Sequence, residues 1–162
     1  MSSHSDVLGI LRTDARTSVE DIARQTGLEE ADVEEVIAEL EDSGVVKGFQ
    51  AVVDWDRVED EPVRAVVELN VTLDRETSYN EVAERVAKFP NVESLQLVSG
   101  DYDLLMEVRG ESMSEVSSFI SEKVAPVPEI TQTVSHYMMD TYKKRGIELG
   151  DGHDDDRLSV SP

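Results

Sequence analysis

Residues 95–108, LQLVSGDYDLLMEV, contain two apolar runs with β-strand character on either side of Ser99-Gly100-Asp101. Glycine followed by aspartate is strong turn chemistry, because both residues tolerate backbone angles that most others avoid. The stretch therefore predicts a β-hairpin. Apolar side chains occupy both alternations of each run, so we expect both strands to be central in a sheet, with helices on one face and room for another subunit on the other.

The residues around this hairpin predict the rest of a sheet. Residues 63–73 alternate between apolar and polar, which is typical of a long strand, and residues 130–142 form a final one. Two amphipathic helices are expected, over 78–89 and over 112–124, the second with Met113 inward. The order βαββαβ is the ferredoxin-like arrangement. A shift of 38 residues places Val82 on Ile120 and Val86 on Val124, as a duplicated βαβ half would.

The first third of the chain predicts three short helices and a β element. The helices cover 5–12, a segment capped by Thr17 and Glu20 that runs to Gly27, and 31–43. Residues 45–53 then predict a small hairpin or wing. Together these elements indicate an α+β protein: an N-terminal winged helix-turn-helix followed by the ferredoxin-like domain. The expected boundaries are 1–53 for the first domain, 54–62 for a linker, 63–146 for the second domain and 147–162 for a disordered acidic tail.

The composition excludes several classes of protein. There is no cysteine, so disulfides and thiolate chemistry are excluded, and no apolar run approaches the roughly 20 residues of a membrane helix. No signal peptide is visible, so we expect a cytoplasmic protein without membrane association. The 36 acidic and 15 basic residues give a net charge of −21. Such an excess fits a halophile's cytoplasm, where concentrated salt screens carboxylate repulsion; the alternative is an ordinary acidic protein.

These residues resemble the Lrp/AsnC family, the feast/famine transcriptional regulators, from about Asp6 to Lys144. The resemblance in the first domain rests on Asp14-Ala-Arg16, Asp21-Ile-Ala23, Gly27-Leu28, Leu40-Glu-Asp-Ser-Gly44 and the segment 45–53, and in the second on residues 98–108. It implies a DNA-binding helix-turn-helix joined to a small-molecule-sensing domain. That second domain would form homodimers or larger homo-oligomers and bind an amino acid near the glycine-aspartate turn.

The helix that should read DNA departs from this family. Residues 25–46 contain no basic residue and carry eight carboxylates, whereas phosphate contacts need cations and base contacts usually need Arg, Lys, Asn or Gln. Contact with DNA would then be weak or indirect, through Arg12, Arg16, Arg24 and Lys47, with Arg57 nearby. An alternative is a sensor that has lost DNA binding and forms hetero-oligomers with basic relatives.

A third reading is an enzyme similar to the sirohaem decarboxylases, which some relatives of the family resemble. We expect no catalytic residue, no metal site and no cofactor, because no nucleophile-base pair, metal-ligand spacing or phosphate loop appears in the sequence. His136 alternates with Val134 and Met138, which is typical of a packed or hydrogen-bonded strand histidine. His153 beside Asp154, Asp155 and Asp156 suits loose cation binding at most, with a flexible tail as the alternative.

The effector hypothesis concerns the predicted turn. Gly100 allows close backbone approach, Asp101 and Asp103 can pair with an amino group, and turn N–H groups can receive a carboxylate. Thr131 and Thr133 on the final strand add hydroxyls at a subunit interface. In the alternative, Asp101 and Asp103 only set the hairpin. The candidate effector residues are Ser99, Gly100, Asp101, Tyr102, Asp103, Thr131 and Thr133.

Overall fold

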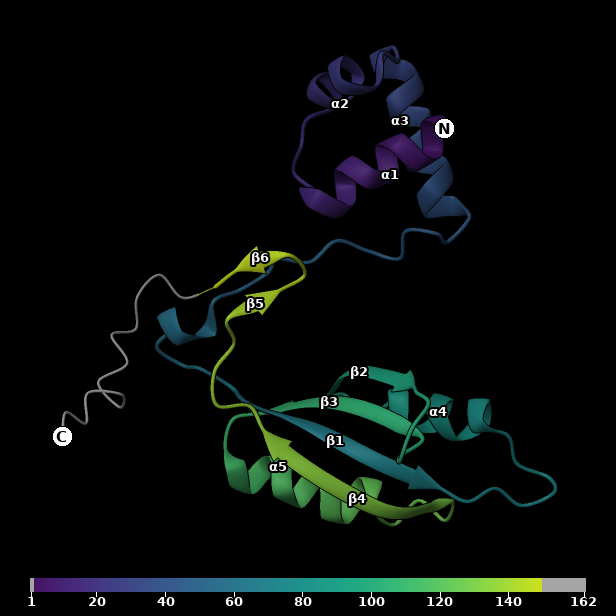
Figure 1. The fold of residues 1–162 in the computed structure, drawn as a ribbon, viewed down its shortest axis with the longest axis vertical. Helices are drawn as coiled ribbons and strands as arrows, with labels where there is room; N and C mark the ends of the chain where they lie inside the picture. The colour runs from purple at the N-terminus through teal and green to yellow at the C-terminus, as the bar shows by residue number, and fades with distance from the viewer. Residues whose placement is uncertain (1, 150–162) are drawn as a thin grey trace. The chain divides into compact units, whose positions relative to one another are not determined.

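Alternating residues build the central strand of the second domain. In the computed structural model, which describes residues 2–149, Val63–Val71 form β1 and pair antiparallel with both β3 (Leu104–Gly110) and β4 (Ile130–Tyr137). Strand β2 (Val92–Leu97) pairs with β3, which gives the sheet order β2-β3-β1-β4 (Figure 1). With helix α4 between β1 and β2 and α5 between β3 and β4, the predicted βαββαβ order is confirmed.

Both helices of this domain cover the same face of the sheet. Helix α4 (Tyr79–Ala87) contributes Val82 and Val86, and α5 (Met113–Phe119) continues into a π-helical turn η2 (Ile120–Val124). These helices share one core with a single alternation of the strands, which includes Ala65, Val67, Leu69, Leu104, Met106 and Val108. The positions related by the 38-residue repeat, Val82 with Ile120 and Val86 with Val124, are all buried there. The other alternation, including Glu68 and His136, lies on the face away from this core.

The hairpin of residues 95–108 is confirmed, with Leu97 opposite Leu104. The expectation that both of its strands are central is wrong, because β1 takes the second pairing edge of β3 and leaves β2 at the end of the sheet. Leu97 is accordingly 59% exposed. Two smaller expectations are also wrong: Met113 is 59% exposed rather than inward, and β4 ends at Tyr137 rather than at residue 142.

The first domain packs three helices on one core. They are α1 (Ser3–Thr13), α2 (Val19–Thr26) and α3 (Glu30–Asp42). Their buried residues are Val7, Leu11, Ile22, Ala23, Val33, Val36 and Leu40. Gly27 and Gly44 follow α2 and α3 with φ of 76° and 72°, a left-handed conformation that glycine adopts at little energetic cost.

Two local expectations in this domain are wrong. Ser18, not Thr17, caps α2: its hydroxyl accepts a hydrogen bond from the Asp21 N–H at 3.1 Å, while the Thr17 hydroxyl donates to the Asp14 carbonyl. Residues 45–53 form no strand, because they pair with no other part of residues 2–149 as a ladder. A short hairpin does form one compact unit with these three helices, but it comes from the far end of the chain: β5 (Lys143–Lys144) and β6 (Ile147–Glu148).

The chain divides into two compact units. One contains the residues up to Val53 together with Lys143–Glu148, and the other contains Asp54–Tyr142. The second unit begins with a 3₁₀ turn, η1 (Trp55–Arg57), in the segment expected to be a linker. Across residues 2–149, the structure contains no helix with the length and apolar character needed to cross a membrane. The candidate cation site at His153 lies outside the described residues.

Candidate functional site

The turn between β2 and β3 is open to solvent. Gly100 has φ of +135°, which disfavours any residue with a side chain, and a Cβ built there would meet nothing within 4 Å. Ser99 and Asp101 are exposed and Tyr102 is half-buried. The Asp101 carbonyl accepts a hydrogen bond from Asn70 Nδ2 at 2.9 Å, but its carboxylate has no hydrogen-bond or ion-pair partner in residues 2–149. This carboxylate is therefore available to a ligand.

Asp103 is used differently, although it lies only two residues further on. One carboxylate oxygen accepts from the Val71 N–H at 2.7 Å and the other from the Tyr79 hydroxyl at 3.3 Å. Its own N–H donates to the Leu69 carbonyl at 3.0 Å. The nearby charge of Asp103 raises the pKa of Tyr79, because it opposes a second negative charge on the phenol, and burial acts in the same direction. Asp103 thus joins the end of β1 to the turn and to α4.

Asn70 connects the turn to β4. Its side-chain amide donates a hydrogen bond to the Asp101 carbonyl, and its own backbone carbonyl accepts a hydrogen bond from the Thr131 hydroxyl at 3.3 Å. Thr131 is exposed at the start of β4, whereas Thr133 is half-buried opposite Leu69. The structure therefore brings Thr131 to the same end of the sheet as the turn. Sequence reasoning missed Asn70; the only signal was a polar residue near the end of a strand.

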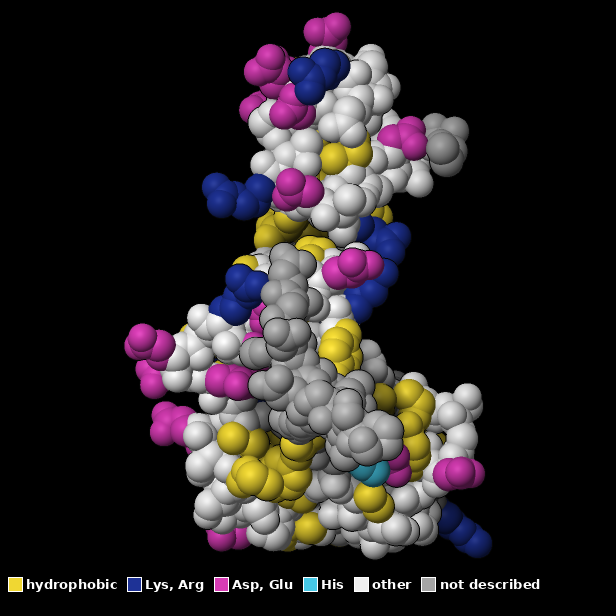
Figure 2. Space-filling view, turned by 60° about the vertical axis from the view of Figure 1, so that its left-hand side comes forward, with side chains coloured by type: hydrophobic (Ala, Val, Ile, Leu, Met, Phe, Trp, Pro, Cys, Tyr) yellow, Lys and Arg dark blue, Asp and Glu magenta, His cyan; other side chains and the backbone are white. Residues whose placement is uncertain are grey.

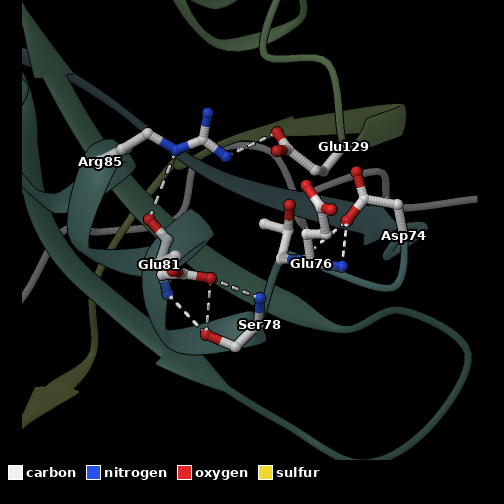
Figure 3. A network of polar contacts seen from close by, with 7 residues as sticks. Asp74, Glu76, Ser78, Glu81, Arg85 and Glu129 are labelled. Carbon is white, nitrogen blue, oxygen red and sulfur yellow. Dashed lines mark hydrogen bonds and ion pairs between the residues drawn. The ribbon is translucent and has the colours of Figure 1, made fainter.

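A second polar network orders the loop that leads from β1 into α4 (Figure 3). The Asp74 carboxylate accepts from the N–H groups of Glu76 and Thr77 at 2.9 and 2.8 Å, and these bonds lower its pKa. Ser78 and Glu81 form a reciprocal capping box at the start of α4. Arg85 on the same helix pairs with Glu129, just before β4, at 2.6 Å.

The third helix presents carboxylates where a DNA-reading helix presents cations. Val33, Val36 and Leu40 are buried, and every acidic residue of α3 is exposed: Glu30, Asp32, Glu34, Glu35, Glu39, Glu41 and Asp42. His4 on α1 reaches Glu39 at 2.6 Å. On the face shown in Figure 2, carboxylates (magenta) and Lys and Arg side chains (dark blue) both lie scattered over the surface.

The candidate DNA-binding cations are all exposed but not all free. Arg12 lies in the last turn of α1 and Arg16 in the following loop, and neither has an ion pair within the described part of the chain. Arg24 pairs with Asp21 on its own helix. Lys47 folds back over the end of α3, where its Nζ lies 2.6 Å from the position of a Cβ built on Gly44. Arg24 is therefore the least available of the four.

His136 occupies the sheet face away from the helices. Its Nε2 lies 3.2 Å from a carboxylate oxygen of Glu68 on the neighbouring strand, and both side chains are partly exposed. Residues 2–149 contain no group of three or more His, Asp or Glu side chains placed to hold a metal ion.

Comparison with known proteins matches both parts of the chain. Residues 3–47 match the family model "Winged helix-turn-helix DNA-binding", and residues 64–147 match "Lrp/AsnC ligand binding domain". A DNA-binding module followed by a ligand-binding module defines the class of ligand-responsive transcriptional regulators. The second match alone covers half of the chain. The chain belongs to the Lrp/AsnC family of transcriptional regulators.

Individual relatives agree with this assignment. An uncharacterized HTH-type transcriptional regulator of Bacillus subtilis, YugG, is 37% identical over 159 residues, 98% of this chain and 96% of that protein. A crystal structure of an AsnC family regulator from Agrobacterium tumefaciens has a TM-score of 0.68 at 26% identity, covering 93% of this chain and 97% of the other. A Neisseria meningitidis regulator crystallised with L-methionine has a TM-score of 0.66 at 18% identity, covering 93% and 96%.

Proposed function

We propose that this regulator responds to an amino acid bound at the turn between β2 and β3. The observation that carries the proposal is the exposed carboxylate of Asp101 beside Gly100, which has no partner among residues 2–149 and lies at the sheet end where Asn70 and Thr131 also lie. Such a carboxylate can accept from an α-ammonium group, and turn N–H groups can donate to an α-carboxylate. The L-methionine complex of the Neisseria regulator supports an amino acid as the ligand class.

Within this proposal the seven candidate residues have unequal roles. Gly100, Asp101 and Thr131 contact the ligand, with Ser99 and Tyr102 beside them, and Asn70 positions the turn. Asp103 stabilises the site without contacting the ligand, since its two carboxylate oxygens accept hydrogen bonds from the Val71 N–H and the Tyr79 hydroxyl. Thr133 supports β4.

Isothermal titration calorimetry with the amino acids tests the effector site. We expect one or a few of them to release heat with the wild-type protein, and Asp101→Ala to bind about tenfold or more weakly, as expected for a lost charge-assisted hydrogen bond. Asp60→Ala is the matched control, because Asp60 is also an exposed aspartate of the same unit and lies outside the turn. Absence of heat with every amino acid would overturn the effector proposal.

We also propose that contact with DNA is weak or indirect. The exposed face of α3 repels phosphates, so Arg12, Arg16 and Lys47 have to supply the attraction. A mobility shift with the protein's own upstream region, in low and near-molar KCl, tests direct binding. A shift that appears only after a basic relative is added would select the hetero-oligomer reading instead.

The remaining partners follow from the same role. We propose that the protein forms a homodimer or larger homo-oligomer through the second domain. It acts in the cytoplasm as a regulator, without a catalytic step. Light scattering coupled to size exclusion measures the mass. A Soret band on adding sirohaem would contradict the purely regulatory role.

A further inference from the structure

The short hairpin β5-β6 is built for an exposed, defined turn. Arg145 and Gly146 have φ of +50° and +85°, the left-handed pair that a two-residue type I′ turn requires. Lys143 lies opposite Glu148, and the Leu149 N–H donates to the Tyr142 carbonyl at 2.9 Å, which extends the pairing by one step. The turn therefore holds Lys143, Lys144 and Arg145 in a defined arrangement, in which Lys143 and Arg145 are exposed and Lys144 is half-buried.

This hairpin belongs to the helix-turn-helix unit, although it follows the last strand of the effector domain in the chain. It forms one side of a groove of about 810 Å³. The other sides are the end of α1, the loop between α1 and α2, and the extended segment 45–52. Residues from both ends of the sequence thus line one depression of a single unit.

The groove gathers cations in a chain that is otherwise strongly acidic. Its ionisable lining residues are Arg12, Asp14, Arg16, Lys47 and Arg145, four cations against one carboxylate. The Asp14 carboxylate accepts a hydrogen bond from the Arg16 backbone N–H at 2.9 Å, so it is engaged in its own loop. None of the four cations has an ion pair to any residue from 2 to 149. Cations without partners attract anions from outside.

We propose that the C-terminal hairpin is a phosphate-binding arm of the DNA interface, with Lys143, Lys144 and Arg145 contacting the duplex backbone beside Arg12, Arg16 and Lys47. This proposal rests on the DNA-binding role proposed above and adds where the contact is made. The carboxylates of α3 exclude phosphates from the helix that usually reads DNA, so the duplex backbone is held at the groove instead. Backbone contacts position a duplex without reading its sequence, which fits an interface poor in base-reading side chains.

The chain also runs directly from the last strand of the effector domain into the proposed arm. Strand β4 carries Thr131 near its start, ends at Tyr137, and is followed after five residues by β5.

Salt-dependent binding of a labelled duplex, measured by fluorescence anisotropy with the full chain, tests the arm. The test variant is Lys143→Gln/Lys144→Gln/Arg145→Asn, in which asparagine tolerates the left-handed turn position. The control variant Arg75→Gln/Lys88→Gln/Lys123→Gln removes the same charge from exposed positions of the other unit. Circular dichroism confirms that both variants fold.

We expect the test variant to bind about tenfold or more weakly at low salt, and its slope of log K against log salt to fall in magnitude by about 2–3, at roughly 0.9 for each lost phosphate contact. The control variant keeps the wild-type slope apart from a small uniform effect of net charge. Lys143→Arg/Lys144→Arg/Arg145→Lys keeps the charges and should bind like the wild type. If the wild type binds and the test variant matches the control, the arm is overturned while DNA binding stands; if the wild type does not bind, both fail.

Lysine acetylation by an N-hydroxysuccinimide ester, read by mass spectrometry, gives a measurement that does not depend on substitution. Duplex DNA should protect Lys47, Lys143 and Lys144 and leave Lys88 and Lys123 reactive. Equal reactivity with and without the duplex overturns the proposal. Protection already present in the free protein would mean that another segment or a second copy covers the groove, and would also overturn it.

Discussion

Gly44, just after α3, has a backbone conformation that disfavours any residue with a side chain. Its φ is +72°, and a Cβ there would lie 2.6 Å from Nζ and 3.3 Å from Cε of Lys47, the end of a flexible side chain that can move away at little cost. Lys47 places its charge over the end of a helix that has no basic residue in its last turn, where a cation opposes the negative end of the helix dipole. Gly44 therefore sets the end of α3, and the lack of a side chain there leaves room for a cation proposed to contact DNA.

We predict that Gly44→Ala lowers the free energy of unfolding by about 1–2 kcal/mol, because the alanine side chain strains the left-handed backbone at this position. Urea denaturation followed by circular dichroism measures the change. Gly9→Ala is the matched control, because Gly9 lies inside α1 with nothing within 4 Å of its added Cβ, and should stabilise by about 0.5–1 kcal/mol. Equal effects at the two glycines would contradict this account.

Arg85 on α4 and Glu129, just before β4, form an ion pair that joins the helix to the last strand of the second domain. The hydrogen bond from Arg85 is the main cause of the lowered pKa of Glu129, against a smaller opposing effect of burial. A carboxyl whose folded pKa is below its ordinary value of 4.5 stabilises the fold above that pH. The contribution is lost as the pH falls through the lowered folded value.

We predict that Glu129→Gln is less stable than the wild type at neutral pH and that the two stabilities converge as the pH falls below 4.5. Urea unfolding between acid and neutral pH, compared at each pH, isolates this residue from the other carboxylates. Glu122→Gln, at an exposed position with no ion pair among the described residues, should follow the wild-type curve. A constant difference between Glu129→Gln and wild type at all pH values would refute the assignment.

The elements that the sequence predicts well are those whose signal is local. The hairpin at Gly100 and the helices with apolar stripes depend on neighbouring residues, and their order was enough to predict the sheet-and-helix duplication. The edge position of β2 depends on β1 pairing with β3, which no local pattern encodes. Thr17 and Ser18 can both cap a helix, so the start of α2 was misplaced by one residue.

The candidate site shows the same division. The turn residues were found from the sequence, but no local pattern shows that the Asp103 carboxylate accepts hydrogen bonds from Val71 and Tyr79, which are distant in the chain. The Asp101 carboxylate has no such partner among residues 2–149. The hairpin β5-β6 was missed because strands of two residues have no periodicity. Its only sequence signal was a cluster of three cations before Gly146.

For the whole molecule, charge dominates. The net charge is −21. Ion pairs within residues 2–149 engage a minority of its carboxylates: Asp21, Glu39, Asp54, Glu61, Glu68, Glu93 and Glu129. Carboxylates without partners repel one another over the Debye length, about 10 Å at 0.1 M salt and 3 Å at 1 M. We propose that the fold is adapted to concentrated salt, which screens this repulsion.

Salt should therefore act in opposite directions on folding and on DNA binding. We predict that the Tm rises between 0.1 and 2 M KCl, by roughly 4–8 °C for each kcal/mol of repulsion removed, whereas duplex affinity falls because phosphate contacts release counterions. Thermal unfolding by circular dichroism and anisotropy titrations in the same buffers measure the two trends. Glu34→Gln/Glu35→Gln/Glu41→Gln removes three exposed charges from α3 and should raise the Tm at low salt, flatten its salt dependence and strengthen duplex binding. A Tm that falls with KCl, or a triple variant with an unchanged salt dependence, would contradict repulsion between carboxylates as the force that limits stability.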